Sequence, residues 1–238
     1  MQQGIPGIYL LLLCDVMTQL GFDEQKIIGD LGVKRDDLLK PDHRISMEIG
    51  HVAAQRGTAM AADLGLGLAY AQALRVTLHG SVGLVALTSP TIGSALQAMA
   101  RFVALRAPFF QAQLQTEQDH IVMGLEPTMN MDGPIERFLT EAILIGAAIV
   151  VEQLSGRVIE GGWVELKGPE PDYYDRYRDR LPLPLRYEAD GCRVRLPFIC
   201  KTRCRNWRIP QPWNWHVSSV KRNIRICSRT KKNSMKRL

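Results

Sequence analysis

The most informative part of the chain is its centre, HGSVGLVALTSPTIGSALQAMARFVALRAPF, residues 79–109. An apolar, glycine-containing run comes first, and Ser89-Pro90-Thr91 follows it. Proline is favoured in the first turn of a helix, and Ser and Thr side chains cap helix N-termini. The apolar residues after this cap recur at helical spacing. We therefore expect a helix that begins at Thr91 or Ser89.

The residues before this stretch also carry helix signals. Residues 8–20 are apolar at helical spacing and stop at Gly21, which suits a helix end. Ser46 is a suitable N-cap for a helix that runs to about residue 60. Residues 62–74 predict one more helix, weakened by its two glycines. The first third of the chain is thus expected to be helical.

Residues after the central stretch predict a hairpin and then a long helix. Residues 109–116 and 120–125 alternate around a short polar join, which is typical of a β-hairpin. Asp132-Gly133-Pro134 then opens the longest helix, which ends near Gly156. Its segment 135–154 is apolar nearly all round, so it is buried either in the core or against a partner subunit. We favour the core and keep the dimer contact as the alternative.

The last part of the body predicts short strands. Residues 158–166 suit a strand, and residues 173–180 suit a short polar helix. Residues 185–187 and 193–196 resemble a second hairpin joined through Asp190-Gly191. The fold class is therefore α+β: an N-terminal helical half, followed by antiparallel strands around one long apolar helix.

Charge divides the chain near residue 198. Residues 199–238 hold twelve Lys or Arg and no Asp or Glu. The whole chain has 30 basic and 24 acidic residues, so residues 1–198 hold 30 − 12 = 18 basic residues and all 24 acidic ones. The net charge of +6 thus combines a mildly acidic body, 1–198, with a strongly basic tail, 199–238.

The composition of the tail allows several interpretations. Positive charges interleaved with tryptophans could hold phosphates and stack on bases, or lie on an anionic membrane surface. A further alternative is a solvated, disordered end without a binding function. We favour a tail that is out of frame. Back-translation of residues 199–220 with free choice of synonymous codons allows a shifted peptide with acidic residues, an Asp-Ser cap and helical spacing of leucine and alanine.

Known catalytic and metal-binding patterns do not occur in the sequence. The histidines are scattered without H-E-x-x-H spacing, and no serine lies in a G-x-S-x-G motif. The five cysteines are odd in number, and only Cys200 and Cys204 are close, which fits neither a disulfide framework nor a zinc site. Neither a secretory signal nor a membrane span is expected from the first apolar run. We expect no enzyme, no cofactor and a cytoplasmic protein.

Three polar residues stand out within apolar helical surface: His79, Arg101 and Arg106. A small-molecule pocket is mostly apolar, with a few polar groups that fix the orientation of the ligand. An arginine there could hold a carboxylate through paired hydrogen bonds. We take the three as candidate ligand-binding residues. The alternatives are solvated or salt-bridged arginines and a histidine with a core or capping role.

The order of these signals resembles the N-terminal sensing domain of AraC-type transcription regulators, in the variety called arabinose-binding-like. Three stretches carry the resemblance: LGFDEQKIIGDLGVKRDDLLKPDHRIS at 20–46, ADLGLGLAYAQAL at 62–74, and the central stretch 79–109. None of them is a strong motif alone. Their order and spacing together are specific. The resemblance covers the chain up to about residue 198.

This resemblance implies an effector-sensing domain that forms a homodimer and controls transcription. Members of the family pair it with a C-terminal DNA-reading domain of two helix-turn-helix units, on the order of a hundred residues. Residues 199–238 do not look like that domain, so we expect a truncated or frameshifted chain without specific operator binding and without a membrane partner. The alternatives are a stand-alone ligand-binding or dominant-interfering module, and a nonspecific nucleic-acid or membrane binder acting through the tail.

Overall fold

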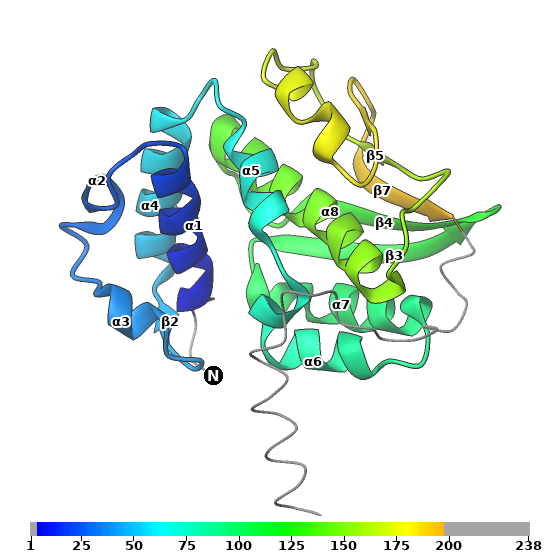
Figure 1. The fold of residues 1–238 in the computed structure, drawn as a ribbon, viewed down its shortest axis with the longest axis horizontal. Helices are drawn as coiled ribbons and strands as arrows, with labels where there is room; N and C mark the ends of the chain where they lie inside the picture. The colour runs from blue at the N-terminus through cyan, green and yellow to red at the C-terminus, as the bar shows by residue number, and fades with distance from the viewer. Residues whose placement is uncertain (1–3, 198–238) are drawn as a thin grey trace, which may run out of the picture. The chain divides into compact units, whose positions relative to one another are not determined.

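The structure is a computed structural model that describes residues 4–197 (Figure 1). All of the described residues belong to one compact unit. The interpretations of residues 199–238 therefore lie outside the described residues. Helices and strands both build this unit, which confirms the α+β class.

The first part of the chain is helical, as its sequence predicts. Its helices are α1 (Gly7–Gln19), α2 (Gln25–Ile28), α3 (Arg35–Leu38), α4 (Met47–Met60) and α5 (Leu66–Ala73). A short antiparallel ladder of β1 (Ile5–Pro6) and β2 (Arg44–Ile45) ties the start of α1 to the residues before α4. The Ser46 hydroxyl accepts a hydrogen bond from the Ile49 amide at 3.2 Å, which confirms the predicted cap of α4.

The central stretch folds as a 3₁₀ turn and two helices. They are η1 (Val76–His79), α6 (Ser81–Thr88) and α7 (Ile92–Arg106). The Thr91 hydroxyl accepts from the Ser94 amide at 3.1 Å, and the Ser94 hydroxyl accepts from the Thr91 amide at 3.1 Å. This reciprocal pair satisfies two amides that the helix itself leaves unpaired. The expected helix start is confirmed, and the cap is Thr91 and not Ser89.

Within residues 4–197 the main sheet has five strands in the order β3-β4-β7-β5-β6. They are β3 (Phe110–Glu117), β4 (His120–Pro127), β5 (Trp163–Glu165), β6 (Leu185–Arg186) and β7 (Cys192–Pro197). β3 and β4 form the first predicted hairpin, with Glu117 opposite His120. Neighbouring strands are antiparallel except for β5 and β6, which are parallel. The sheet is therefore mixed and not purely antiparallel as expected.

The second predicted hairpin is wrong. β6 pairs with β5, and β7 lies between β4 and β5. After β6 the chain runs beside the residues that come directly after β5 in the sequence. The amides of Glu188 and Ala189 donate hydrogen bonds to carbonyl oxygens of those residues. β7 then pairs with β4 along its whole length, a ladder that the two residues of β6 cannot offer. Because a longer ladder forms more backbone hydrogen bonds, β7 pairs with β4 and not with β6.

Two further predictions need correction. The strand expected over residues 158–166 is only the three residues of β5, because Gly161 leaves the extended region with φ at +79°. The polar helix expected over residues 173–180 is a pair of 3₁₀ turns, η2 (Tyr174–Arg176) and η3 (Arg178–Arg180). Its buried side chains, Tyr174 and Tyr177, are three residues apart, the repeat of a 3₁₀ turn.

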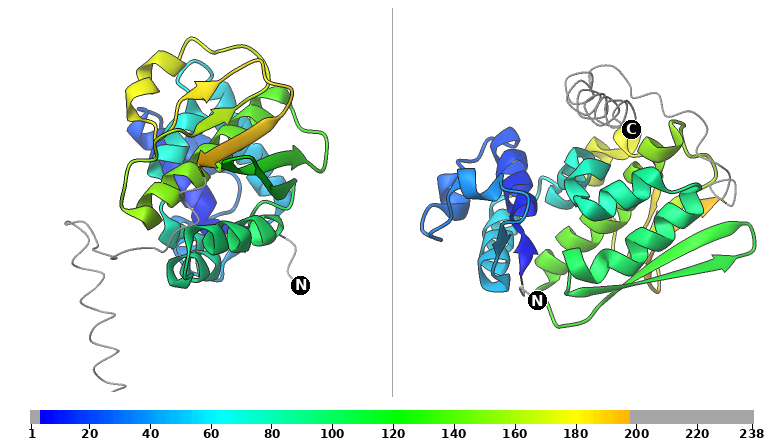
Figure 2. Two further views of the ribbon diagram at one scale, coloured as in Figure 1. Left: turned by 90° about the vertical axis from the view of Figure 1, so that its right-hand side faces the viewer. Right: turned by 90° about the horizontal axis from the view of Figure 1, so that it is seen from below.

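The long apolar helix, α8 (Gly133–Ser155), is buried by its own chain. It packs against α5 and against the strands β4 and β7 (Figures 1 and 2). Its side chains Leu144, Ile145 and Val150 are fully buried, and Gly156 caps its end with φ at +65°. By length and composition α8 could cross a membrane, but a buried core helix passes the same test. Its packing supports the core interpretation.

Among the described residues, the two larger of three hydrophobic cores meet along α8. The first joins α7 and α8 to the sheet and includes Leu96, Phe110 and Leu144. The second joins the N-terminal helices and includes Met17 of α1 and Phe138 of α8. Since α8 contributes to both, it connects the helical part to the sheet.

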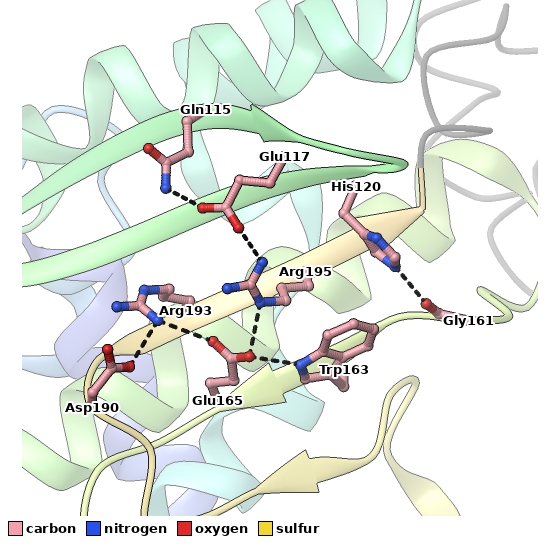
Figure 3. Close-up of polar contacts among 9 residues, drawn as sticks. All are labelled: Gln115, Glu117, His120, Gly161, Trp163, Glu165, Asp190, Arg193 and Arg195. Carbon is pink, nitrogen blue, oxygen red and sulfur yellow. Dashed lines mark hydrogen bonds and ion pairs between the residues drawn. The ribbon is translucent and has the colours of Figure 1, made fainter.

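The outer face of the sheet carries a network of polar side chains (Figure 3). Arg195 of β7 donates from Nη1 to Glu117 of β3 at 2.6 Å, and from Nε to Glu165 of β5 at 2.8 Å. The Trp163 indole also donates to Glu165, at 2.9 Å. Burial raises the pKa of Glu165, but these hydrogen bonds outweigh burial and hold the pKa below its usual range. The network links strands that are not direct neighbours.

Candidate functional site

A cavity of about 460 Å³ is lined by residues of both hydrophobic cores. Its wall is formed by α1, α4, α5, η1, α6, α7 and α8, with the strands β1, β2 and β4 and the segment before α8. Most of the lining side chains are apolar, among them Leu13, Leu74, Phe102, Met123, Phe138 and Ile143. The volume falls within the roughly 300–1,000 Å³ that small-molecule sites occupy.

Polar side chains from four elements come together in this wall. The Tyr9 hydroxyl of α1 lies 2.8 Å from Nδ1 of His79 in η1. Arg106, at the end of α7, donates from Nη2 to the carbonyl oxygen of His79. The Tyr70 hydroxyl of α5 donates to the carbonyl oxygen of Tyr9 at 2.9 Å. These side chains form a polar corner in a mostly apolar wall.

Gly80 makes room for the arginine in this corner. Its φ of +56° and ψ of −129° belong to a backbone region that is almost exclusive to glycine. A Cβ at this position would lie 2.7 Å from Nη2 of Arg106. The missing side chain therefore lets the guanidinium lie against the backbone, where it reaches the His79 carbonyl.

The electrostatic surroundings of the corner are positive. Burial and, second to it, the charge of Arg106 lower the pKa of His79 to about 4, so the imidazole is neutral at pH 7. Burial raises the pKa of Tyr9 to about 12, against the opposing charges of Arg106 and Arg44. Within residues 4–197, no Asp or Glu forms a salt bridge with Arg106. The arginine charge at this corner is thus not neutralised by a carboxylate of the described part of the chain.

Other lining residues are open to solvent. Glu48 and His51 of α4, and Met129 and Asn130 before α8, line the same cavity with exposed side chains. Met129, a large apolar side chain, is 54% exposed. These residues mark the side from which a ligand can enter.

Comparison with known proteins identifies the family of this chain. The family model described as the N-terminal arabinose-binding domain of AraC transcription regulators matches residues 21–199. The chain belongs to this AraC-type family. The expectation from the sequence resemblance is confirmed.

Relatives of this AraC-type chain are transcription regulators. The ornithine utilization regulator of Pseudomonas aeruginosa is 20% identical over 211 residues, which cover 89% of this chain and 56% of that protein. The chain thus spans about half the length of this curated relative. The crystal structure of the transcriptional regulator CdpR from Pseudomonas aeruginosa matches with 15% identity and a TM-score of 0.44, over 65% of this chain and 55% of that one.

The AraC-type fold brings together two of the three candidate ligand residues. His79 and Arg106 line the cavity and contact each other. Arg101 is exposed, is not among the lining residues, and lies with its guanidinium 5.9 Å from the ring centroid of Phe102. Residues five apart on a helix point to different faces, so Arg101 and Arg106 cannot both reach one corner.

Sequence reasoning missed the other members of the corner. Tyr9 lies in the apolar run of α1, 70 positions before its partner His79, and Tyr70 lies in α5. A tyrosine within a buried apolar stretch indicates that its hydroxyl needs a hydrogen-bond partner there. This is a weak signal for a site, because the sequence does not identify the partner. Only the tertiary structure shows which partner it finds.

A second cavity of this AraC-type domain surrounds the buried Glu141 of α8. Its volume is about 650 Å³, and α4, α5 and α8 line it. The Tyr173 hydroxyl donates to Oε1 of Glu141 at 2.8 Å, and Arg137 Nε lies 3.4 Å from the same oxygen. Burial raises the pKa of Glu141 to about 7, against these two partners. The corner of the first cavity, with several convergent polar groups in apolar walls, is closer to a ligand site.

Proposed function

We propose that this chain is the effector-sensing domain of an AraC-type regulator, and that the effector occupies the cavity of about 460 Å³. One observation carries the proposal: Tyr9, His79 and Arg106 converge in one corner of an apolar cavity. Apolar walls supply binding energy, and a few placed polar groups supply orientation.

Signalling follows from the position of the cavity. An effector there touches residues of both hydrophobic cores, and α8 belongs to both. Binding favours the arrangement of the N-terminal helices against the sheet that gives the effector the best contacts. In a full-length regulator, this shift changes how the DNA-reading helices are presented.

The family also supports the proposed partners. A homodimer, and DNA as a partner of the full-length regulator, are proposals that rest on the AraC-type assignment. The relatives are bacterial transcription regulators, which supports a cytoplasmic and non-enzymatic role.

The proposed ligand site is tested by filling the cavity with a larger side chain. Val103→Trp places a large side chain at a lining position of α7, whereas Gln97→Trp adds the same group at an exposed position of that helix. Titration with a neutral, apolar fluorescent dye is expected to show binding to the unmodified chain and to Gln97→Trp, but much weaker binding to Val103→Trp. Circular dichroism checks that all three are folded. Equal dye binding by the two variants would place the dye elsewhere and contradict the proposal.

A further inference from the structure

The charge of Arg106 is the unusual feature of the cavity. Apolar surroundings make a charge costly unless an opposite charge or hydrogen bonds compensate it. Among residues 4–197 its side chain has a single hydrogen bond, from Nη2 to the His79 carbonyl, and no salt bridge. A guanidinium has five N–H donors, so most of them remain for a bound molecule.

The neighbours of Arg106 also suit an anion. His79 is neutral, and its Nδ1 shares one hydrogen bond with the Tyr9 hydroxyl, so in either tautomer one N–H or O–H of this pair remains as a further donor. The charged groups that act on Tyr9 and His79 are arginines: Arg106 on both and Arg44 on Tyr9. The corner therefore presents donors and positive charge.

We propose that the effector is an amphipathic monocarboxylate, whose carboxylate binds Arg106 and whose apolar body fills the rest of the cavity. This inference rests on the proposed function of the cavity. A planar guanidinium matches a carboxylate through two parallel hydrogen bonds. Side chains such as Phe102, Met123 and Ile143 offer the body apolar contacts only.

A small amino acid suits the cavity less well. Its ammonium group needs an acidic or carbonyl partner, and the acidic side chain of the lining, Glu48, is exposed to solvent. The buried acid Glu141 belongs to the second cavity and is already bonded to Tyr173. An ammonium inside the apolar walls would be left without compensation. The regulator relative is named for ornithine utilization, so ornithine is a useful contrasting probe.

The experiment compares ligands of one shape and different charge. Decanoate, decan-1-ol, decylammonium and L-ornithine are titrated by calorimetry into the full chain, below the concentrations at which the amphiphiles form micelles. Decanoate is expected to bind at least about tenfold more tightly than decan-1-ol, the factor that one charge-assisted hydrogen bond supplies. Decylammonium and L-ornithine are expected to bind more weakly still.

Two matched arginine variants test whether Arg106 is the group that binds the carboxylate. Arg106→Gln should reduce decanoate affinity to that of decan-1-ol, with decan-1-ol affinity unchanged, because the apolar walls remain. Arg101→Gln, five positions earlier on the same helix and exposed, should change neither affinity. A decanoate preference that survives Arg106→Gln would overturn the assignment of the head-group site.

The remaining outcomes separate the inference from the proposed function. Equal affinity for decanoate and decan-1-ol in the unmodified chain would overturn the carboxylate inference and leave the cavity as a ligand site. Tighter binding of L-ornithine than of decanoate would overturn the amphipathic character of the proposed effector and also leave the cavity as a ligand site. Absence of binding by every apolar probe, together with dye binding that is insensitive to Val103→Trp, would overturn both.

Discussion

Gly80 holds a backbone conformation, φ +56° and ψ −129°, that a side chain makes costly, and it does so beside the guanidinium of Arg106. The residue thus has two roles: it turns the chain from η1 into α6, and it leaves space for the polar corner. Glu141 also lies in an environment that is unusual for its residue type, because acidic side chains are rarely buried. It is 1% exposed, and burial raises its pKa to about 7.

Gly80→Ala is expected to destabilise the fold by about 1–3 kcal/mol, because the new Cβ both strains the backbone and meets Arg106. Urea unfolding monitored by circular dichroism measures this. Gly124→Ala, at a strand position where a Cβ would meet nothing within 4 Å, is the control and should change the free energy of unfolding far less. Equal losses in both variants would show that the Gly80 conformation is not special.

Glu141→Gln is expected to remove a pH dependence of stability. The pKa of Glu141 is about 7 in the folded chain, above its ordinary value of 4.5, so between these values the folded chain holds a proton that the unfolded chain lacks. Stability from this group is therefore present below about pH 4.5 and is lost as the pH rises through 7, by up to about 3 kcal/mol.

Melting temperatures of both proteins at pH 5.5, 7 and 8 measure this effect. The difference between the variant and the unmodified chain cancels other titrating groups, among them His79, whose lowered pKa acts in the opposite direction below pH 6.5. The Gln variant should gain relative stability from pH 5.5 to about pH 7, and the gain should level off toward pH 8. A constant difference would show that Glu141 is ionised throughout this range.

At the scale of elements, polar bonds as well as apolar packing define the sheet. Arg195 connects β7 to β3 and β5, and its side chain is only 16% exposed (Figure 3). Removing one partner of such a pair leaves the carboxylates less compensated than before. The outer face is therefore part of what holds the strand order.

Arg195→Met is expected to lower the free energy of unfolding by about 1–3 kcal/mol, since Glu117 and Glu165 lose a charged donor. Chemical denaturation checks the value. Lys40→Met, which breaks an exposed pair with Asp37, should leave stability almost unchanged. A loss at Arg195 no larger than the loss at Lys40 would mean that the network is only a surface feature.

Elements with local signals could be predicted from the sequence, and elements with distant partners could not. The caps at Ser46 and Thr91 and the glycine after α8 set helix ends within a few residues, so those helices were predicted. The pairing of β7 with β4 depends on residues about seventy positions apart, and local alternation pointed instead to β6. The site divides in the same way: His79 and Arg106 stood out singly, while Tyr9 emerged only through its contact with His79.

At the scale of the whole molecule, the two cores, the cavity and the basic tail set what the chain can do. The cavity draws on the two larger cores, and its lining residues within the described part of the chain lie between Ile5 and Ala147. The proposed division is thus a sensing body, 1–198, and a tail, 199–238, that adds twelve positive charges. Sequence-independent binding to nucleic acid, where it occurs, is expected to come from these charges and to weaken with salt.

Deletion of residues 199–238 is expected to leave binding in the cavity unchanged. Retention on a DNA column at low salt should be lost, because the body alone has a net charge of 18 − 24 = −6. Dye titration and salt elution measure the two properties. Loss of dye binding on deletion would mean that the tail forms part of the sensing unit.

The nucleotide sequence tests the frame hypothesis directly. Read in the alternative frame beyond codon 198, the gene is expected to encode two helix-turn-helix units. Stop codons soon after that point would contradict the hypothesis and leave the tail as a genuine part of the protein.

Because the cavity is shared by the two cores, its occupant also affects how long the protein survives in a cell. A molecule bound only by the folded chain stabilises it by RT ln(1 + [L]/Kd), about 2.7 kcal/mol at a hundredfold excess over Kd. Proteases degrade the opened chain, whose population falls by the same factor. Scarcity of the metabolite would then deplete the receptor itself, so that cellular abundance, and not only conformation, reports the supply.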